Sequence, residues 1–133
     1  MVKREKLYDA FGELIYAIAM SDGAVQEEEI KTLELFLSQH PWAKEIKWSF
    51  NYENQKNHTV EEAYQKAIEV CKENGPDPEY KLILDLMTNV AESFDGIVKQ
   101  EKELIEKFRT DLRDRFIKDM EENKLGYFDR DGF

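Results

Sequence analysis

The stretch AIAMSDGAVQEEEIKTL, residues 17–33, decides the fold of this chain. It begins as the end of an apolar run, passes through Asp-Gly-Ala-Val and continues into three consecutive glutamates. Glycine supplies a turn geometry that residues with a Cβ resist, and the helix dipole favours acidic side chains in a first turn. The stretch therefore predicts the end of one helix, a short turn and the start of a second helix.

The same construction occurs twice, because Asp22-Gly23-Ala24-Val25 is echoed by Asp95-Gly96-Ile97-Val98. On both sides of each turn, apolar residues recur at steps of three and four, which is the period of one helix face. A sequence that repeats one helix-turn-helix unit favours a repeated architecture over an unrelated string of helices. We therefore predict an all-α fold in which two related helical hairpins pack as one helical bundle.

The rest of the chain fits one domain of residues 1–133, since this length leaves no room for a second core. Thr59-Val60-Glu61-Glu62 matches a capping box and predicts a helix start. Residues 43–58 fit neither a helix nor a strand period, so an irregular connection is expected there. The last helix is expected to end before Gly126, followed by a polar and aromatic tail over 127–133.

Composition excludes several classes of partner. The net charge is -10, and each half of the chain, 1–75 and 76–133, carries -5, so the whole surface is acidic. Nucleic-acid binding depends on basic residues that displace counterions from phosphates, and no basic stripe is present, so neither nucleic acid nor a membrane is expected. Glu5, Asp9 and Glu13 interrupt any signal peptide. The single cysteine fits a reducing compartment, and we expect a cytoplasmic protein.

At the two junctions the sequence resembles the tellurite-resistance TerB-like family, whose helical domains carry paired A-x-A-D-G-x-V-x-x-x-E junctions. Ala17 to Glu29 follows this pattern closely, with Ser21 where alanine is common. The second junction departs from it, because Lys102 stands at the glutamate position, between Glu101 and Glu103. The matching stretches are roughly 7–37 and 80–112. The resemblance implies an all-helical fold, no known enzymatic chemistry and an acidic surface linked to divalent-cation binding.

The acidic residues at the junctions have a structural and a functional interpretation. In the structural one, Gln26 caps a helix and Glu29 at its third position bonds back to the cap, with Gln100 and Glu103 doing the same in the second junction. An EF-hand is excluded, because Ile18 and Met20 would fall on ligand positions. In the functional one, carboxylates from both junctions converge on a weakly bound, water-rich divalent cation, Ca²⁺ or Mg²⁺. Its candidate ligands are Asp22, Glu29 and Asp95 together with Glu101 or Glu103.

No catalytic residues are predicted. Cys71 lies on an apolar helix face and is expected to be a core thiol, while His40 and His58 have no zinc ligand at the required spacing. The sequence thus favours a non-enzymatic binding module that requires no cofactor. The alternative is a scaffold domain without a metal site, which binds a protein partner through the aromatic segment 41–58. Its candidate contacts are Trp42, Trp48, Phe50 and Tyr52, which could equally cover the helical core; the oligomeric state is left open.

Overall fold

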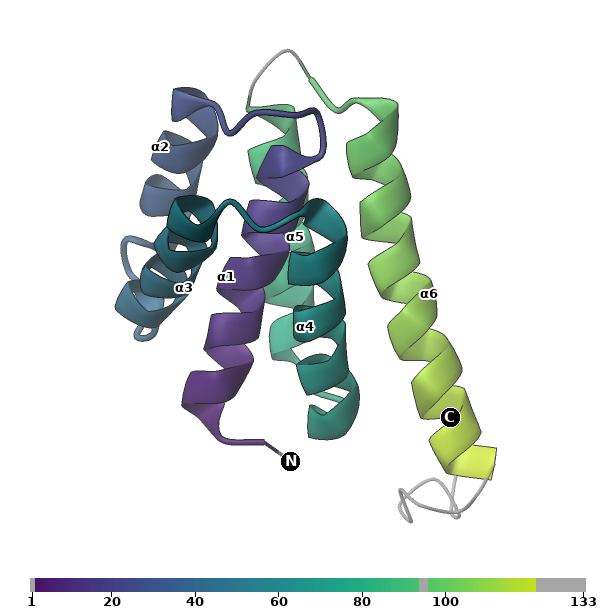
Figure 1. The fold of residues 1–133 in the computed structure, drawn as a ribbon. Helices are drawn as coiled ribbons and strands as arrows, with labels where there is room; N and C mark the ends of the chain where they lie inside the picture. The colour runs from purple at the N-terminus through teal and green to yellow at the C-terminus, as the bar shows by residue number, and fades with distance from the viewer. Residues whose placement is uncertain (1, 94–95, 122–133) are drawn as a thin grey trace.

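A computed structural model describes residues 2–93 and 96–121 of the chain, with side chains in the second range described as far as residue 118. Within these residues the chain forms a bundle of six helices and no strand (Figure 1). The all-α prediction is therefore confirmed. The helices are α1 (Arg4–Met20), α2 (Glu27–Leu37), α3 (Ala43–Lys56), α4 (Val60–Asn74), α5 (Glu79–Glu92) and α6 (Lys99–Glu121).

Helix α1 forms the centre of the bundle. Its side chains are buried on almost every side, which is typical of a helix enclosed by others. It packs most extensively against α3 and α4 and also contacts α5 and α6. Figure 1 shows these helices arranged around it. Helix α2 packs instead against α5 and α3.

One glycine allows α1 and α3 to approach closely. A Cβ added to Gly12 would lie 2.4 Å from the Ile46 carbonyl oxygen and 2.6 Å from the Ser49 Cβ. The Ser49 hydroxyl donates a hydrogen bond of 2.6 Å to the backbone carbonyl of Asp9 across the same crossing. Gly12 is therefore required by packing, and is more than a tolerated glycine within a helix.

The expected irregular connection over 43–58 is wrong, because α3 occupies Ala43–Lys56. Its buried positions, Ile46, Ser49, Phe50 and Glu53, follow the spacing of one helix face. Two of these four residues are polar, which conceals the apolar period on which the sequence prediction depended. The helix ends at Lys56, and the next residue, Asn57, caps it in the left-handed conformation with φ 54°.

The predicted capping box at the start of α4 is confirmed. The Glu62 amide donates to the Thr59 hydroxyl at 3.1 Å, and the Thr59 amide donates to the Glu62 carboxylate at 2.9 Å. The predicted tail over 127–133 and the predicted end of the last helix before Gly126 lie outside the described residues. No helix in the described part of the chain combines the length and apolar character needed to cross a membrane.

Candidate functional site

The first junction connects α1 to α2 through a turn and a reciprocal cap. Gly23 has φ 101°, which an L side chain resists, and the Asp22 carboxylate accepts a hydrogen bond of 3.3 Å from the Ala24 amide. The Gln26 amide donates to the Glu29 carboxylate at 2.7 Å, so the predicted roles of Gln26 and Glu29 are confirmed. Glu29 is only 2% exposed, while Asp22 is exposed.

The second junction uses a different register from the one predicted. The Val98 amide donates to the Glu101 carboxylate at 2.9 Å, and the Val98 carbonyl accepts from the Lys102 amide at 3.1 Å. Val98 therefore takes the cap position and Glu101 the third helical position, so the assignment of Gln100 and Glu103 to these roles is wrong. The cause is the turn, which has one residue fewer between its glycine and the helix cap than the first junction has.

Glu101 is thus the structural counterpart of Glu29. It is 2% exposed, whereas the Glu103 side chain is 64% exposed and lies 3.8 Å from the Lys99 ammonium. Both buried glutamates lie at the third position of a helix that starts at the same end of the bundle (Figure 1). Asp95 lies outside the described residues.

The two buried carboxylates interact electrostatically. Burial raises the pKa of Glu29 to about 7 against the hydrogen bond from Gln26, and the negative charges of Asp22 and Glu101 raise it further. Burial also raises the pKa of Glu101 against the hydrogen bond from Val98, and the charge of Asp22 adds to this rise. The charge of Asp22 thus acts on both buried glutamates, but carboxylate oxygens of Asp22, Glu29 and Glu101 do not all lie within 4.8 Å of one another, so the described residues of the two junctions form no closed ligand set.

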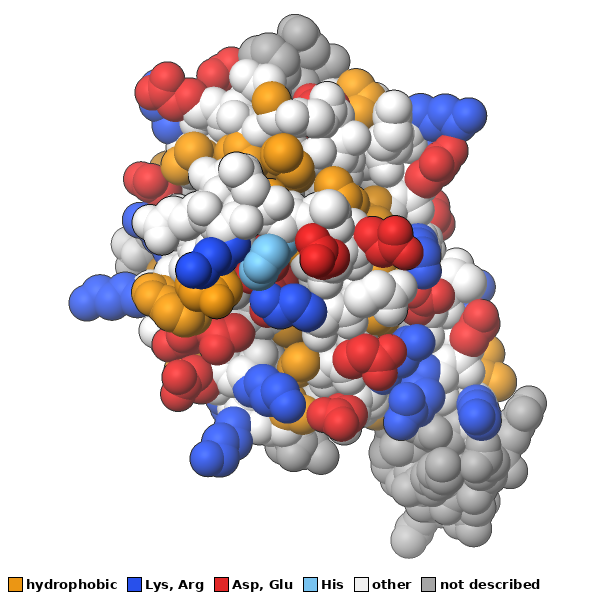
Figure 2. All heavy atoms as spheres, in the orientation of Figure 1, with side chains coloured by type: hydrophobic (Ala, Val, Ile, Leu, Met, Phe, Trp, Pro, Cys, Tyr) orange, Lys and Arg blue, Asp and Glu red, His pale blue; other side chains and the backbone are white. Residues whose placement is uncertain are grey.

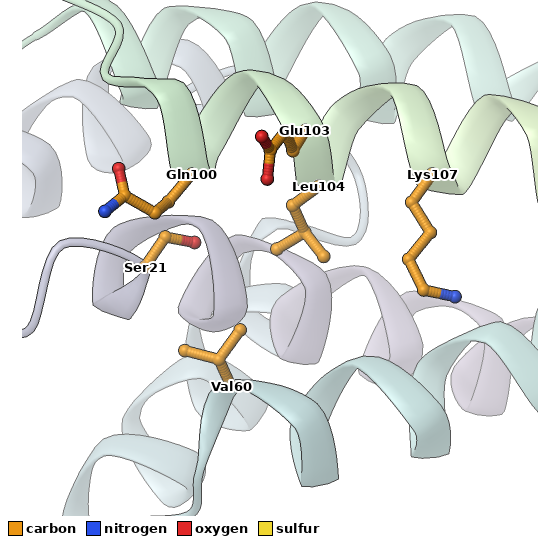
Figure 3. A pocket seen from close by; sticks show the side chains of 6 residues that line it. All are labelled: Ser21, Val60, Gln100, Glu103, Leu104 and Lys107. Carbon is orange, nitrogen blue, oxygen red and sulfur yellow. The ribbon is translucent and has the colours of Figure 1, made fainter.

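A shallow cleft adjoins this region, with a volume of about 330 Å³. It lies between the starts of α6 and α4 and the end of α1, and Figure 3 shows Leu104 and Val60 pointing into it from opposite sides. Its lining is Ser21, Val60, Gln100, Glu103, Leu104 and Lys107. Glu103 therefore faces this cleft, while Glu101 is buried in the junction.

A second acidic cluster was not predicted from the sequence. One carboxylate oxygen from each of Glu5, Asp9 and Glu45 lies within 4.8 Å of the others. Glu5 and Asp9 share a face of α1 because they are four residues apart, and Glu45 comes from α3. Burial and a hydrogen bond with Glu45 raise the pKa of Asp9 to about 7. Sequence reasoning missed this cluster because it treated residue 45 as part of an irregular connection.

The four aromatic residues proposed as partner contacts divide into two pairs. Phe50 is 2% exposed and belongs to the core, and Trp42 stacks on Tyr8 with ring centroids 5.1 Å apart. Trp48 is 58% exposed and Tyr52 is 40% exposed, and their rings stack on each other at 5.5 Å. Of these four residues, Trp48 and Tyr52 therefore present a large aromatic surface to solvent.

The remaining chemically active side chains have internal partners. The fully buried Glu53 contacts the His58 imidazole and the Lys66 ammonium, each at 2.9 Å. The His40 imidazole contacts the Glu79 carboxylate at 3.2 Å. Cys71 is completely buried, and this burial raises the pKa of its thiol to about 12. The contacts of Glu53 and His40 connect separate parts of the fold. Burial keeps the Cys71 sulfur in its unreactive thiol form.

No protein-family model, no curated protein and no solved structure matches this chain significantly. The resemblance to the TerB-like family therefore rests on the two junction motifs alone.

Proposed function

We propose that the chain is a non-enzymatic binding module, related to the TerB-like family, which takes up a divalent cation at its two helix junctions. The observation that carries the proposal is that Glu29 and Glu101 occupy equivalent, nearly buried cap positions at one end of the bundle, where the charge of Asp22 acts on both. Two nearly buried carboxylates near each other repel, and a bound cation would remove that repulsion.

The chemistry of the donors fits a hard cation. Ca²⁺ and Mg²⁺ take six or more oxygen ligands, many of which can be water molecules. Glu29 and Glu101 each use one carboxylate oxygen to accept a backbone amide, which leaves the second oxygen as a donor. With Asp22 as an exposed third carboxylate, the site would be weak and rich in water, in agreement with a role that requires no resident cofactor.

A titration with CaCl₂, MgCl₂ and MnCl₂, followed by amide chemical shifts and calorimetry, tests the proposal. We expect the amides of Asp22, Gln26 and Val98 to shift, because the caps that they form include the ligands. The variants Glu29→Gln and Glu101→Gln should each weaken binding at least about tenfold, which is the loss of roughly one charged ligand. Binding should strengthen as pH rises from 6 to 8, since a protonated carboxyl is a poor ligand.

The matched control is Glu27→Gln, which removes a charge from the same first turn at a side chain that is 77% exposed. This variant should retain the affinity of the original chain within about twofold. If no cation shifts the junction amides up to about 10 mM, or if the control weakens binding as much as Glu29→Gln does, the proposal is wrong.

A further inference from the structure

The surface beside α1 and α3 joins two features that the cation proposal does not use. The first is the carboxylate triad, Glu5, Asp9 and Glu45, whose oxygens lie within 4.8 Å of each other. The second is the aromatic pair, Trp48 and Tyr52, which is exposed and stacked. Figure 2 shows hydrophobic side chains gathered over α3, with acidic side chains directly below them.

The two features are adjacent. Glu45 and Trp48 are three residues apart on α3, so their side chains are neighbours on the helix surface. Tyr52 follows Trp48 by four residues and extends the pair away from the triad. A chain crossing this surface would therefore meet three carboxylates and then an aromatic face within about two helical turns.

Among the described residues, the triad has no countercharge. No lysine, arginine or histidine in the described part of the chain forms an ion pair with Glu5, Asp9 or Glu45, although such pairs occur on every helix of the bundle. One carboxylate oxygen of Asp9 is also buried without a hydrogen-bond partner. The hydrogen bond between Asp9 and Glu45 requires a proton on one of the two carboxyl groups, and a cationic donor would take the place of that proton and also satisfy the unpartnered oxygen of Asp9.

The cations of this chain near the aromatic pair lie away from the triad. Lys56 and Lys66 place their ammonium groups 5.7 and 5.8 Å from the Tyr52 ring centre, at the end of the pair remote from Glu45. Lys44 precedes Glu45 in sequence but projects about 100° away from it around the helix. Lys44 also neighbours Trp48, four residues further along α3, but no cation in the described part of the chain lies over the Trp48 ring, which is 58% exposed.

We propose that the carboxylate triad and the aromatic pair form a docking surface for a basic segment of a partner protein. An arginine or lysine of the partner enters the triad and donates to its carboxylates, and its neighbouring side chain covers Trp48. The net charge of -10 supports this choice of partner, because it attracts basic segments and repels nucleic acid. The proposal is independent of cation binding at the junctions.

Fluorescein-labelled hexa-arginine, with hexa-glutamate as the negative probe, tests the docking surface by anisotropy and by amide shift mapping. We expect hexa-arginine to shift amides within 4–9 and 44–52, and hexa-glutamate to shift none. The double variant Glu5→Gln, Glu45→Gln should weaken binding about fivefold, as expected for two partly exposed ion pairs. Trp48→Ala should weaken it about tenfold or more, as expected for an interface anchor.

The matched control is the double variant Glu61→Gln, Glu92→Gln, which removes the same charge from exposed positions elsewhere and should change affinity less than about twofold. Equal weakening by the control, or shifts spread over the whole acidic surface, would show non-specific attraction and overturn the proposal. Shifts at 4–9 and 45 caused by CaCl₂ but not by the peptide would identify a metal site instead. The variant Glu29→Gln should bind hexa-arginine normally, which separates this result from any failure of the junction proposal.

Discussion

Replacing Gly12 by alanine tests the closest approach in the bundle. A Cβ at this position would lie 2.4 Å from the Ile46 carbonyl oxygen, against about 3.4 Å for an ordinary contact. Helices α1 and α3 would therefore have to separate by roughly 1 Å. Because the obstructing oxygen and the nearby Phe50 nitrogen belong to the backbone, rotation of a side chain cannot relieve the overlap.

Three effects determine the change in stability, of which two destabilise the variant and one stabilises it. Overpacking a core costs about 1–3 kcal/mol, and separating the helices also weakens the hydrogen bond from Ser49 to the Asp9 carbonyl, which contributes about 1 kcal/mol. Alanine is a better helix former than glycine by about 0.8–1 kcal/mol. We expect Gly12→Ala to lower the free energy of unfolding by about 2 kcal/mol, or the melting temperature by roughly 8 °C.

Urea unfolding followed by circular dichroism at 222 nm measures this effect. The comparison variant is Ser49→Ala, which removes the hydrogen bond across the same crossing without adding volume and should cost about 1 kcal/mol. A Gly12→Ala protein as stable as the original chain, or no less stable than Ser49→Ala, would refute the argument that the α1–α3 backbones are in contact.

Three further predictions concern charged and capping groups. The pKa of Glu29 is about 7 in the folded protein, against its usual value of 4.5. The stability that the protonated Glu29 contributes below pH 4.5 is therefore lost as the pH rises through 7. In urea unfolding between pH 5 and 8, the free energy of unfolding should fall less for Glu29→Gln than for the original chain. Lys66→Met should lower the free energy of unfolding by about 2–3 kcal/mol, since it leaves the buried Glu53 without the Lys66 ammonium. Lys6→Met, at an exposed ion pair, should change the free energy of unfolding by less than about 0.5 kcal/mol. Thr59→Ala should cost about 1 kcal/mol through the lost cap, measured by thermal unfolding.

The parts of the fold that follow local rules could be predicted from the sequence. Capping boxes depend on side chains only three residues apart, so Gln26 with Glu29 and Thr59 with Glu62 were found from their spacing. The repeated Asp-Gly turn likewise predicted two helix junctions. Such features need no knowledge of what the rest of the chain does.

Helix α3 could not be found in the same way, because its buried face includes Ser49 and Glu53. Both are satisfied by partners that are distant in sequence, the Asp9 carbonyl and Lys66. A polar residue that is buried through a long-range hydrogen bond has the sequence appearance of a surface residue. Apolar periodicity is therefore weakest where a helix is held by polar contacts.

Parts of the candidate sites could not be predicted from the sequence either. The pairing of Glu101 with Val98 was missed because the second turn is one residue shorter, and a single residue changes which glutamate faces inward. The carboxylate triad depends on α1 and α3 crossing at Gly12, which is a tertiary contact. Sequence spacing alone contains no information on such a crossing.

The burial of Cys71 makes this residue a built-in reporter of how the bundle opens. Its sulfur is fully enclosed on the face of α4 that packs in the core, and only the thiolate reacts with alkylating reagents. Alkylation of the native protein must then wait for α4 to separate from its neighbours. The rate of thiol modification, divided by the rate for a fully exposed thiol, would consequently give the equilibrium constant for that separation without denaturant, and would distinguish opening at α4 from unfolding of the whole chain.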